Sequence, residues 1–277
     1  MHNKLISLIE QTETPITKTD IIDAFKRLGI HSKSALEVHA SLSSIGYVVN
    51  KAYDVIDALL EVVTEGVIIM PAHTPELTNP RDWSNPPVPL NYIDVIEKHR
   101  KPFNPKVFIP ERIGEIAKTF MVYPGVQRTL HPEVSLFVYN QTNDPSWLDH
   151  SFDMRVLVHP LHKLQESKGK ILFIGTDFST CTSIHLTEFL CQFSTVSSYD
   201  YEIEVEGIII KKTITTKYFD DDDLNFKAIS ETYIKKYQNT DDYLQTTCGL
   251  ATFSLIDAKK LFNIAKAYHL SYQRNHS

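Results

Sequence analysis

Apolar residues in the first quarter of the chain recur first at helical spacing and then at strand spacing. Ile21, Phe25 and Leu28 fall on one face of a helix that Thr19 would begin and Gly29 would end. Residues 35–39 predict a strand, the apolar positions between 55 and 63 predict a helix, and residues 67–70 predict another strand. This order predicts a βαβ unit with parallel pairing and a right-handed crossover.

The same alternation of patterns continues along the rest of the chain. It predicts strands at 134–138, 170–174 and 250–253, and a hairpin that turns at Glu206 and Gly207. It also predicts helices around 113–120, in a segment that ends at 237, and over 258–268. Residues 254–257 would begin the last of these helices. Strands that alternate with helices predict an α/β fold, a three-layer α/β/α sandwich with a central mixed β-sheet. The late hairpin would supply the antiparallel part of that sheet.

The segment 71–110 differs in character from its surroundings. It holds nine of the 14 prolines of the chain, which interrupt long helices and central strands. It also holds Trp83, Tyr92, Phe103 and Phe108, and is therefore too apolar for a disordered linker. We predict an ordered proline-rich loop insertion that covers a cleft, within a single domain spanning residues 1–277.

Composition narrows the class of protein. The 277 residues are 42% hydrophobic, enough for a substantial core, and the formal net charge of −6 argues against a nucleic-acid partner. No apolar run approaches transmembrane length, so we expect no membrane partner. Cys181, Cys191 and Cys248 are odd in number and form no C-x-x-C pair, which favours a cytoplasmic location without disulfides.

Candidate chemistry follows the strand at 171–174. After Gly175 come hydroxyl residues, and Thr182 and Ser183 are placed to cap the first turn of a helix. His185 and Glu188 are three residues apart and so lie on one helix face. An imidazole beside a carboxylate can take a proton near neutral pH, although the same spacing also occurs in purely structural pairs.

A second candidate site is the loop 39–48, which joins the first strand to a helix. Its small residues let backbone N–H groups approach phosphate oxygens. They are Ala40, Ser41, Ser43, Ser44 and Gly46. The loop lacks the glycine spacing and the Lys-Ser/Thr pair of a P-loop, and serine-rich turns also occur without any ligand.

Five runs in one order resemble the aminoglycoside 3-N-acetyltransferase family, which transfers acetyl from acetyl-CoA to an amine. They are residues 38–48, 66–71, 85–89, 124–135 and 175–188. The first is similar to the family's coenzyme loop, the fourth to its Arg-Ser-x-His-Pro-x-x-Ser segment, and the last to its Thr-x-x-His-Leu-x-Glu signature. The resemblance runs from about residue 17 to the C-terminal helix, nearly the whole chain.

The resemblance implies an acetyl-CoA-dependent N-acetyltransferase acting on the 3-amino group of an aminoglycoside's deoxystreptamine ring, by direct transfer and without a metal. It implies His185 as general base, Glu188 as the residue that orients it, and Thr182 as a donor to the carbonyl oxygen. Acetyl-CoA would contact His39, Ala40, Ser41, Leu42, Ser43, Gly46, Tyr47 and Val48. The amine substrate would contact Asp177 and His131, of which His131 has loop-pinning as an equal alternative. We expect a monomer or a homodimer.

Three departures from the family's pattern bear on the sites more than on the fold. The family has serine at Ala40, a glycine pair at Asn50-Lys51, and Gly-x-x-Ser-Pro-Leu where this chain has residues 155–161. Other readings therefore stay open: the same fold acting on a different amine, a cysteine acyltransferase or hydrolase using Cys181, or a non-catalytic CoA- or amine-binding protein. The acidic run Asp220–Asp223 fits a helix start and, as a lesser alternative, a site for an amine or a metal.

Overall fold

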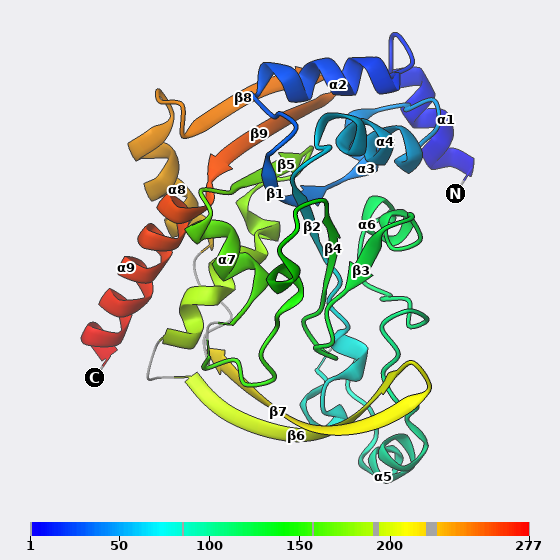
Figure 1. Ribbon diagram of the computed structural model, residues 1–277, viewed down its shortest axis with the longest axis vertical. Helices are drawn as coiled ribbons and strands as arrows, with labels where there is room; N and C mark the ends of the chain where they lie inside the picture. The colour runs from blue at the N-terminus through cyan, green and yellow to red at the C-terminus, as the bar shows by residue number, and fades with distance from the viewer. Residues whose placement is uncertain (1, 85, 157, 191–193, 220–225, 277) are drawn as a thin grey trace.

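Seven strands form the central sheet of the computed structural model, which describes residues 2–84, 86–156, 158–190, 194–219 and 226–276 (Figure 1). Their order across the sheet is β3-β4-β2-β1-β5-β9-β8. The strands are β1 (Ala35–Ala40), β2 (Val67–Pro71), β3 (Val126–Arg128), β4 (Leu136–Asn140), β5 (Lys170–Ile174), β8 (Tyr243–Cys248) and β9 (Ala251–Asp257). Strands β2, β1 and β5 are parallel, whereas β4 and β9 pair antiparallel to this central group. The predicted α/β fold with a mixed sheet is confirmed.

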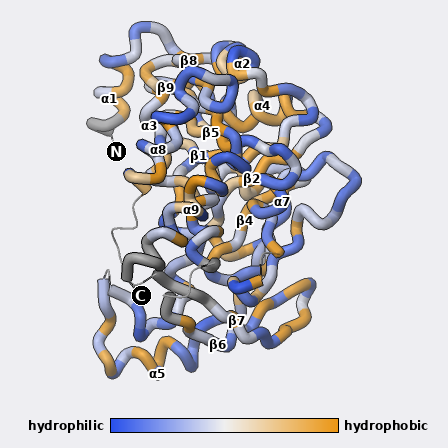
Figure 2. Tube along the Cα trace, turned by 90° about the vertical axis from the view of Figure 1, so that its left-hand side faces the viewer, coloured by the Kyte–Doolittle hydropathy of each residue, from blue (hydrophilic) through white to orange (hydrophobic). Residues whose placement is uncertain are grey.

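Helices cover both faces of the sheet, and the alternation of side chains along β1 shows which layer each residue meets. Leu36 and Val38 pack toward helices α2 (Lys18–Arg27), α4 (Ala52–Val62) and α6 (Glu115–Phe120). The opposite face packs on α7 (Pro160–Glu166), α8 (Phe226–Tyr237) and α9 (Ala258–His276). Because strand side chains alternate between faces, Glu37 and His39 point toward this second layer. Figure 2 shows apolar residues running through the central strands between the two layers.

The hairpin of β6 (Ser194–Val205) and β7 (Ile208–Phe219) turns at Glu206 and Gly207, as predicted. Its two strands form a separate sheet, so the prediction that it makes the central sheet mixed is wrong. The strands that run against the central parallel group are instead β4 and β9, each of which pairs antiparallel with both of its neighbours. The hairpin lies apart from the central sheet because its apolar side chains pack with Leu77 and Phe103. Phe103 also exchanges backbone hydrogen bonds with Glu202 and Glu204. Figure 1 shows it curving across the end of the molecule near α5.

The proline-rich segment contains short elements that its prolines delimit: 3-10 turns η1 (Pro75–Leu77) and η2 (Pro80–Asp82) and helix α5 (Leu90–His99). Arg128 of β3 holds this segment at two points. Its guanidinium donates to the backbone carbonyls of Ala72, at 2.8 Å, and Phe108, at 2.6 Å, and to the Ser135 hydroxyl, at 2.9 Å. These bonds tie both ends of the segment to the sheet.

Helix starts differ from the sequence prediction at both ends of the chain. A first helix, α1 (His2–Gln11), had no predicted counterpart, and α2 is capped by Thr17 rather than Thr19, through a capping box with Asp20. Residues 254–257, predicted to begin the last helix, lie in β9. Pairing with β5 outweighs the local capping pattern there, and only Asp257 caps α9, by accepting from the Lys260 N–H at 2.9 Å.

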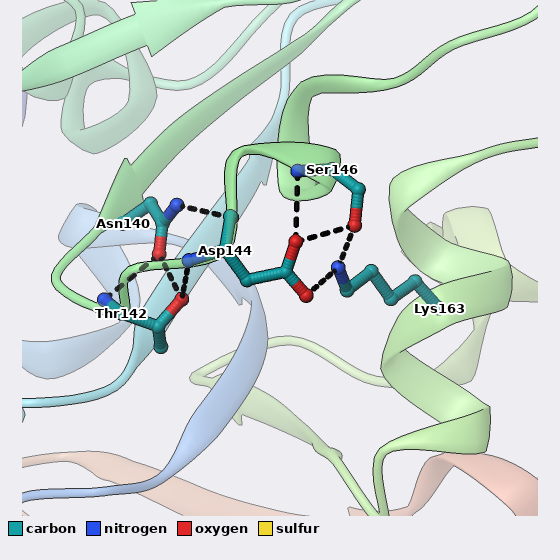
Figure 3. Close-up of polar contacts among 5 residues, drawn as sticks. All are labelled: Asn140, Thr142, Asp144, Ser146 and Lys163. Carbon is teal, nitrogen blue, oxygen red and sulfur yellow. Dashed lines mark hydrogen bonds and ion pairs between the residues drawn. The ribbon is translucent and has the colours of Figure 1, made fainter.

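The turn between β4 and α7 is held by Asp144, which begins η3 (Pro145–Leu148) (Figure 3). Its carboxylate accepts from the Ser146 N–H at 3.0 Å and from the Ser146 hydroxyl at 2.6 Å. Lys163 of α7 donates to both the Asp144 carboxylate and the Ser146 hydroxyl. These bonds link the turn to α7.

Some predictions concern residues that lie outside the described ranges, namely Cys191 and the acidic run 220–223. In the described part of the chain, every helix is too short or too polar to cross a membrane.

Candidate active site

His185 and Glu188 lie in η5 (Thr182–Leu190), which follows β5 and the short turn η4 (Phe178–Thr180). The sequence predicted an α-helix here, whereas η5 is a 3-10 helix. Side chains three residues apart eclipse in a 3-10 helix, and this brings His185 Nδ1 to 2.9 Å from Glu188 Oε1. The imidazole is 47% exposed and the carboxylate 9% exposed, so a substrate can reach the first while the second stays covered.

The surroundings of His185 favour its protonated form. Burial lowers the pKa of the imidazole, but the hydrogen bond and charge of Glu188, together with the charge of Glu37, outweigh burial and raise the pKa above its ordinary value. With Nδ1–H donated to Glu188, the lone pair of Nε2 is left to accept a proton. The ring packs edge-on against Phe226, 5.1 Å between centroids.

Glu37 of β1 is a site residue that the sequence analysis missed. It is 0% exposed, and its carboxylate accepts from His39 Nε2 at 2.8 Å, from the Ser183 N–H at 3.2 Å, and from the Ser183 hydroxyl. Ser183, predicted to cap its own turn, thus binds a strand instead. The available signal was a carboxylate in the middle of a central parallel strand, where both faces are normally apolar.

Three possible metal-binding atoms come together at this point. The side chains of Glu37, His39 and Cys181 place one donor atom each within 4.8 Å of one another. Both oxygens of Glu37 already accept hydrogen bonds from His39 and Ser183, so its carboxylate is satisfied by protein groups alone.

The predicted coenzyme loop lines a cavity of about 500 Å³. Seven of the eight predicted residues border it: Ala40, Ser41, Leu42, Ser43, Gly46, Tyr47 and Val48. His39 does not; it lies beneath, bound to Glu37. The remaining wall comes from Leu5 and Leu8 of α1, Lys51, and the start of α6. The cavity therefore joins the loop after β1 to two helices of the same side of the molecule.

Gly175 lets the end of β5 approach this loop. Its φ is +62°, and a Cβ there would lie 2.6 Å from Ser44 Cβ. Thr182, at the start of η5, has its N atom 3.4 Å from His39 Nε2. The coenzyme loop and the turn that carries His185 are thus direct neighbours.

His131, predicted to contact substrate or pin a loop, is fully buried, and its Nδ1 accepts from the N–H groups of Glu133 and Val134, both at 3.2 Å. Its ring stacks on His150, which in turn contacts His159. Burial, reinforced by neighbouring histidines, lowers the pKa of His131, His159 and His73 to about 3. We call His73, His131, His150 and His159 the histidine cluster, and no local spacing in the sequence indicates this grouping.

Asp177 and Cys181 are the remaining residues that the sequence singled out. Asp177 is exposed and caps η4 by accepting from the Ser179 N–H at 2.9 Å. Cys181 is fully buried, and burial together with the charge of Glu37 raises the pKa of its thiol well above the ordinary value. A neutral, buried thiol is a poor nucleophile.

The chain is similar to known proteins along most of its length. A sequence profile described as aminoglycoside 3-N-acetyltransferase matches residues 38–269. The chain is 35% identical over 203 residues to the SPbeta prophage-derived aminoglycoside N(3')-acetyltransferase-like protein YokD of Bacillus subtilis (strain 168), covering 72% of this chain and 75% of that protein. It is 25% identical over 268 residues to aminoglycoside N(3)-acetyltransferase III of Pseudomonas aeruginosa, covering 92% and 97%.

Solved structures show the same fold. The crystal structure of YokD matches with a TM-score of 0.81 at 29% identity, covering 97% of each chain. The binary complex of AAC-IIIb with CoASH matches with a TM-score of 0.78 at 21% identity, covering 94% of this chain and 98% of that one. The chain belongs to the aminoglycoside 3-N-acetyltransferase family, and it is an acyltransferase of that family, as its sequence motifs predicted.

Proposed function

We propose that the protein transfers acetyl directly from acetyl-CoA to an amine of an aminoglycoside, with His185 as general base. The observation that carries this proposal is the pairing of His185 with Glu188 on a turn whose first residue, Thr182, has its N atom 3.4 Å from Nε2 of His39. His39 immediately precedes the loop that borders the cavity of about 500 Å³. The CoASH complex of the AAC-IIIb neighbour supports acetyl-CoA as the cosubstrate. The net charge of −6 suits a cationic acceptor.

In the proposed reaction, the acceptor ammonium first loses one proton to solvent by way of Nε2 of His185, and the neutral amine then attacks the thioester carbonyl carbon while Nε2 takes a second proton from its nitrogen. Glu188, held at 2.9 Å, stabilises the resulting imidazolium. The tetrahedral intermediate collapses with cleavage of the C–S bond, and the imidazolium returns a proton to the CoA thiolate. Thr182, at the start of η5, is our proposed donor to the carbonyl oxygen.

A thiol-release assay with acetyl-CoA tests this proposal against a panel of aminoglycosides and simpler amines. Turnover with an aminoglycoside carrying a free 3-amino group, and none when that group is blocked, is the expected result. Turnover with simple amines only would mean that the protein catalyses the proposed acetyl transfer but that its acceptor is not an aminoglycoside. CoA binding without any turnover would make the protein a binding module.

Acetylation removes a positive charge from the acceptor amine, the feature by which polycationic drugs bind their targets. We therefore propose antibiotic resistance as the consequence of this activity. The altered segment 155–161 favours one second candidate, the same reaction on another amine, since His159 stands where the family has serine and packs against His150.

The coenzyme assignment predicts the effect of a charge at Ser43, which borders the cavity. Ser43→Asp places a carboxylate beside the phosphates of acetyl-CoA, so the KM for acetyl-CoA should rise about tenfold or more while kcat changes little. Ser43→Asn, of matched size without charge, is the control. Equal KM values for acetyl-CoA in folded Ser43→Asp and wild type would contradict the assignment of this loop to the coenzyme site.

Lys51, which borders the same cavity, has a strained backbone. Its φ is +55°, in the region that favours glycine, and it immediately precedes α4. We expect Lys51→Gly to raise the melting temperature by relieving strain, yet to raise the KM for acetyl-CoA several-fold by removing a cation from the phosphate site. Lys51→Ala separates the two effects, because it removes the charge and keeps the strain; an unchanged KM in both variants contradicts the phosphate contact.

A further inference from the structure

A carboxylate lies fully buried behind the proposed catalytic turn, and it takes no part in the proton transfer by His185 and Glu188. Glu37 sits on β1, the central strand that leads into the coenzyme loop. An ionised carboxylate away from water costs free energy unless several donors compensate it. Glu37 has three donors, from His39 and from the N–H and hydroxyl of Ser183.

These bonds join two parts of the site that are 146 residues apart in sequence. Ser183 lies two residues before His185, so its bonds to Glu37 fasten the start of η5 to the sheet. His39, bound to the same carboxylate, lies near the end of β1, where the coenzyme loop begins. The contact of 2.8 Å between its Nε2 and Glu37 Oε1 fixes the orientation of the ring. One carboxylate thus sets the position of the base relative to the coenzyme.

Resting on the proposed function, we propose that Glu37 is a positioning residue of the acetyl transfer. It holds the His185 turn on β1, and its negative charge adds to that of Glu188 in stabilising the imidazolium that forms during the reaction. The charge of Glu37 acts on His185 across the interior, in the direction that favours protonation. Among the described residues, the other titratable groups acting on His185 are Glu188 on its own turn, His73 after β2, and His269 on α9.

Two variants separate the two roles. Glu37→Gln keeps the shape, the acceptor for His39 and a partner for Ser183, and removes only the charge. Ser183→Ala keeps the charge and removes the hydroxyl tie. Glu65→Gln, on an exposed residue remote from the site, is the matched control for losing one carboxylate.

The first measurement is the titration of the His185 ring by NMR in the enzyme without substrates, which does not depend on acetyl transfer. We expect the midpoint to move to lower pH in Glu37→Gln and to stay at the wild-type value in Ser183→Ala and Glu65→Gln. The acid limb of kcat/KM should move in the same direction in Glu37→Gln. An unmoved midpoint in folded Glu37→Gln overturns the electrostatic role.

The second measurement is steady-state kinetics at pH 8. Glu37→Gln and Ser183→Ala should each lower kcat by about three- to tenfold, with the KM for acetyl-CoA within about twofold of wild type. Unchanged kcat in Ser183→Ala overturns the tie, even if Glu37→Gln fails to fold. Failure of the proposed function gives a different result. A fully active His185→Ala would show that His185 is not the general base. The NMR titration of His185 in wild type and in Glu37→Gln would still test whether the charge of Glu37 acts on the imidazole.

Discussion

Replacing His185 with alanine should lower kcat by about two to four orders of magnitude, because an acceptor ammonium cannot attack the thioester until it loses a proton. The KM for acetyl-CoA should stay within about twofold of wild type, since His185 does not border the coenzyme cavity. Steady-state kinetics with purified, folded variant and saturating amine measures both. Near wild-type turnover across a pH series would make the His185–Glu188 pair structural.

Glu188→Gln is the graded control, because it keeps the shape of the carboxylate and removes its charge. We expect a smaller loss of kcat than in His185→Ala. The raised pKa of His185 also predicts that wild-type turnover falls on acidification at a higher pH than for an ordinary histidine. Because Glu188 is the main cause of that raised pKa, the acid limb should move to lower pH in Glu188→Gln.

The second large effect concerns stability, which should fall steeply between pH 7.5 and pH 5. His73, His131 and His159 have their pKa lowered to about 3 in the fold, chiefly by burial. Below an unfolded pKa of about 6.5 the unfolded chain binds protons that the native protein does not, so native stability drops as pH falls. At pH 5 each histidine costs about 2 kcal/mol, or about 6 kcal/mol for the three.

That loss is comparable to the whole stability of a typical domain, about 5–15 kcal/mol, so the protein should be close to unfolding at pH 5. The raised pKa of His185 has the opposite effect on stability, because the native protein then binds a proton more tightly than the unfolded chain. It concerns one residue and offsets only part of the loss. Denaturant unfolding at a series of pH values measures the dependence. A stability that stays flat from pH 7.5 to pH 5 would contradict the buried, neutral state of the histidine cluster.

A single variant isolates one member of the cluster. His131→Asn keeps an oxygen that can accept from the Glu133 and Val134 N–H groups in place of Nδ1, but it cannot be protonated. Below pH 6, we expect the free energy of unfolding of this variant to fall with decreasing pH less steeply than that of wild type. The difference between the two slopes should be about 1.4 kcal/mol per pH unit. The same substitution at the exposed His31 is the matched control.

Local patterns were sufficient for the order of the central elements. The βαβ unit of β1, α4 and β2, the strand β5 and the hairpin turn all follow from spacings of two or 3.6 residues and from turn residues. The pair His185 and Glu188 was visible for the same reason, since an interval of three residues places side chains together in either an α- or a 3-10 helix. The loop of small residues after β1 was equally local.

Where local patterns competed with packing, the tertiary structure decided. Residues 254–257 carry a capping pattern, yet they extend β9 because β5 offers backbone partners and a buried face. The hairpin 194–219 has the alternation of a sheet strand, yet it packs on Phe103 rather than on a sheet edge. In both cases burial of apolar surface against a distant segment exceeds the weak local preference.

The sequence by itself therefore determined the family, the α/β class, the loop of small residues after β1 and the His185–Glu188 pair, because each depends on residues close together in the chain. Only the tertiary structure brought Glu37 to Ser183 and gathered His73, His131, His150 and His159 into one cluster. Such contacts depend on which strands are neighbours and which face each residue occupies. Both are set by packing of the whole sheet, and no local spacing encodes them.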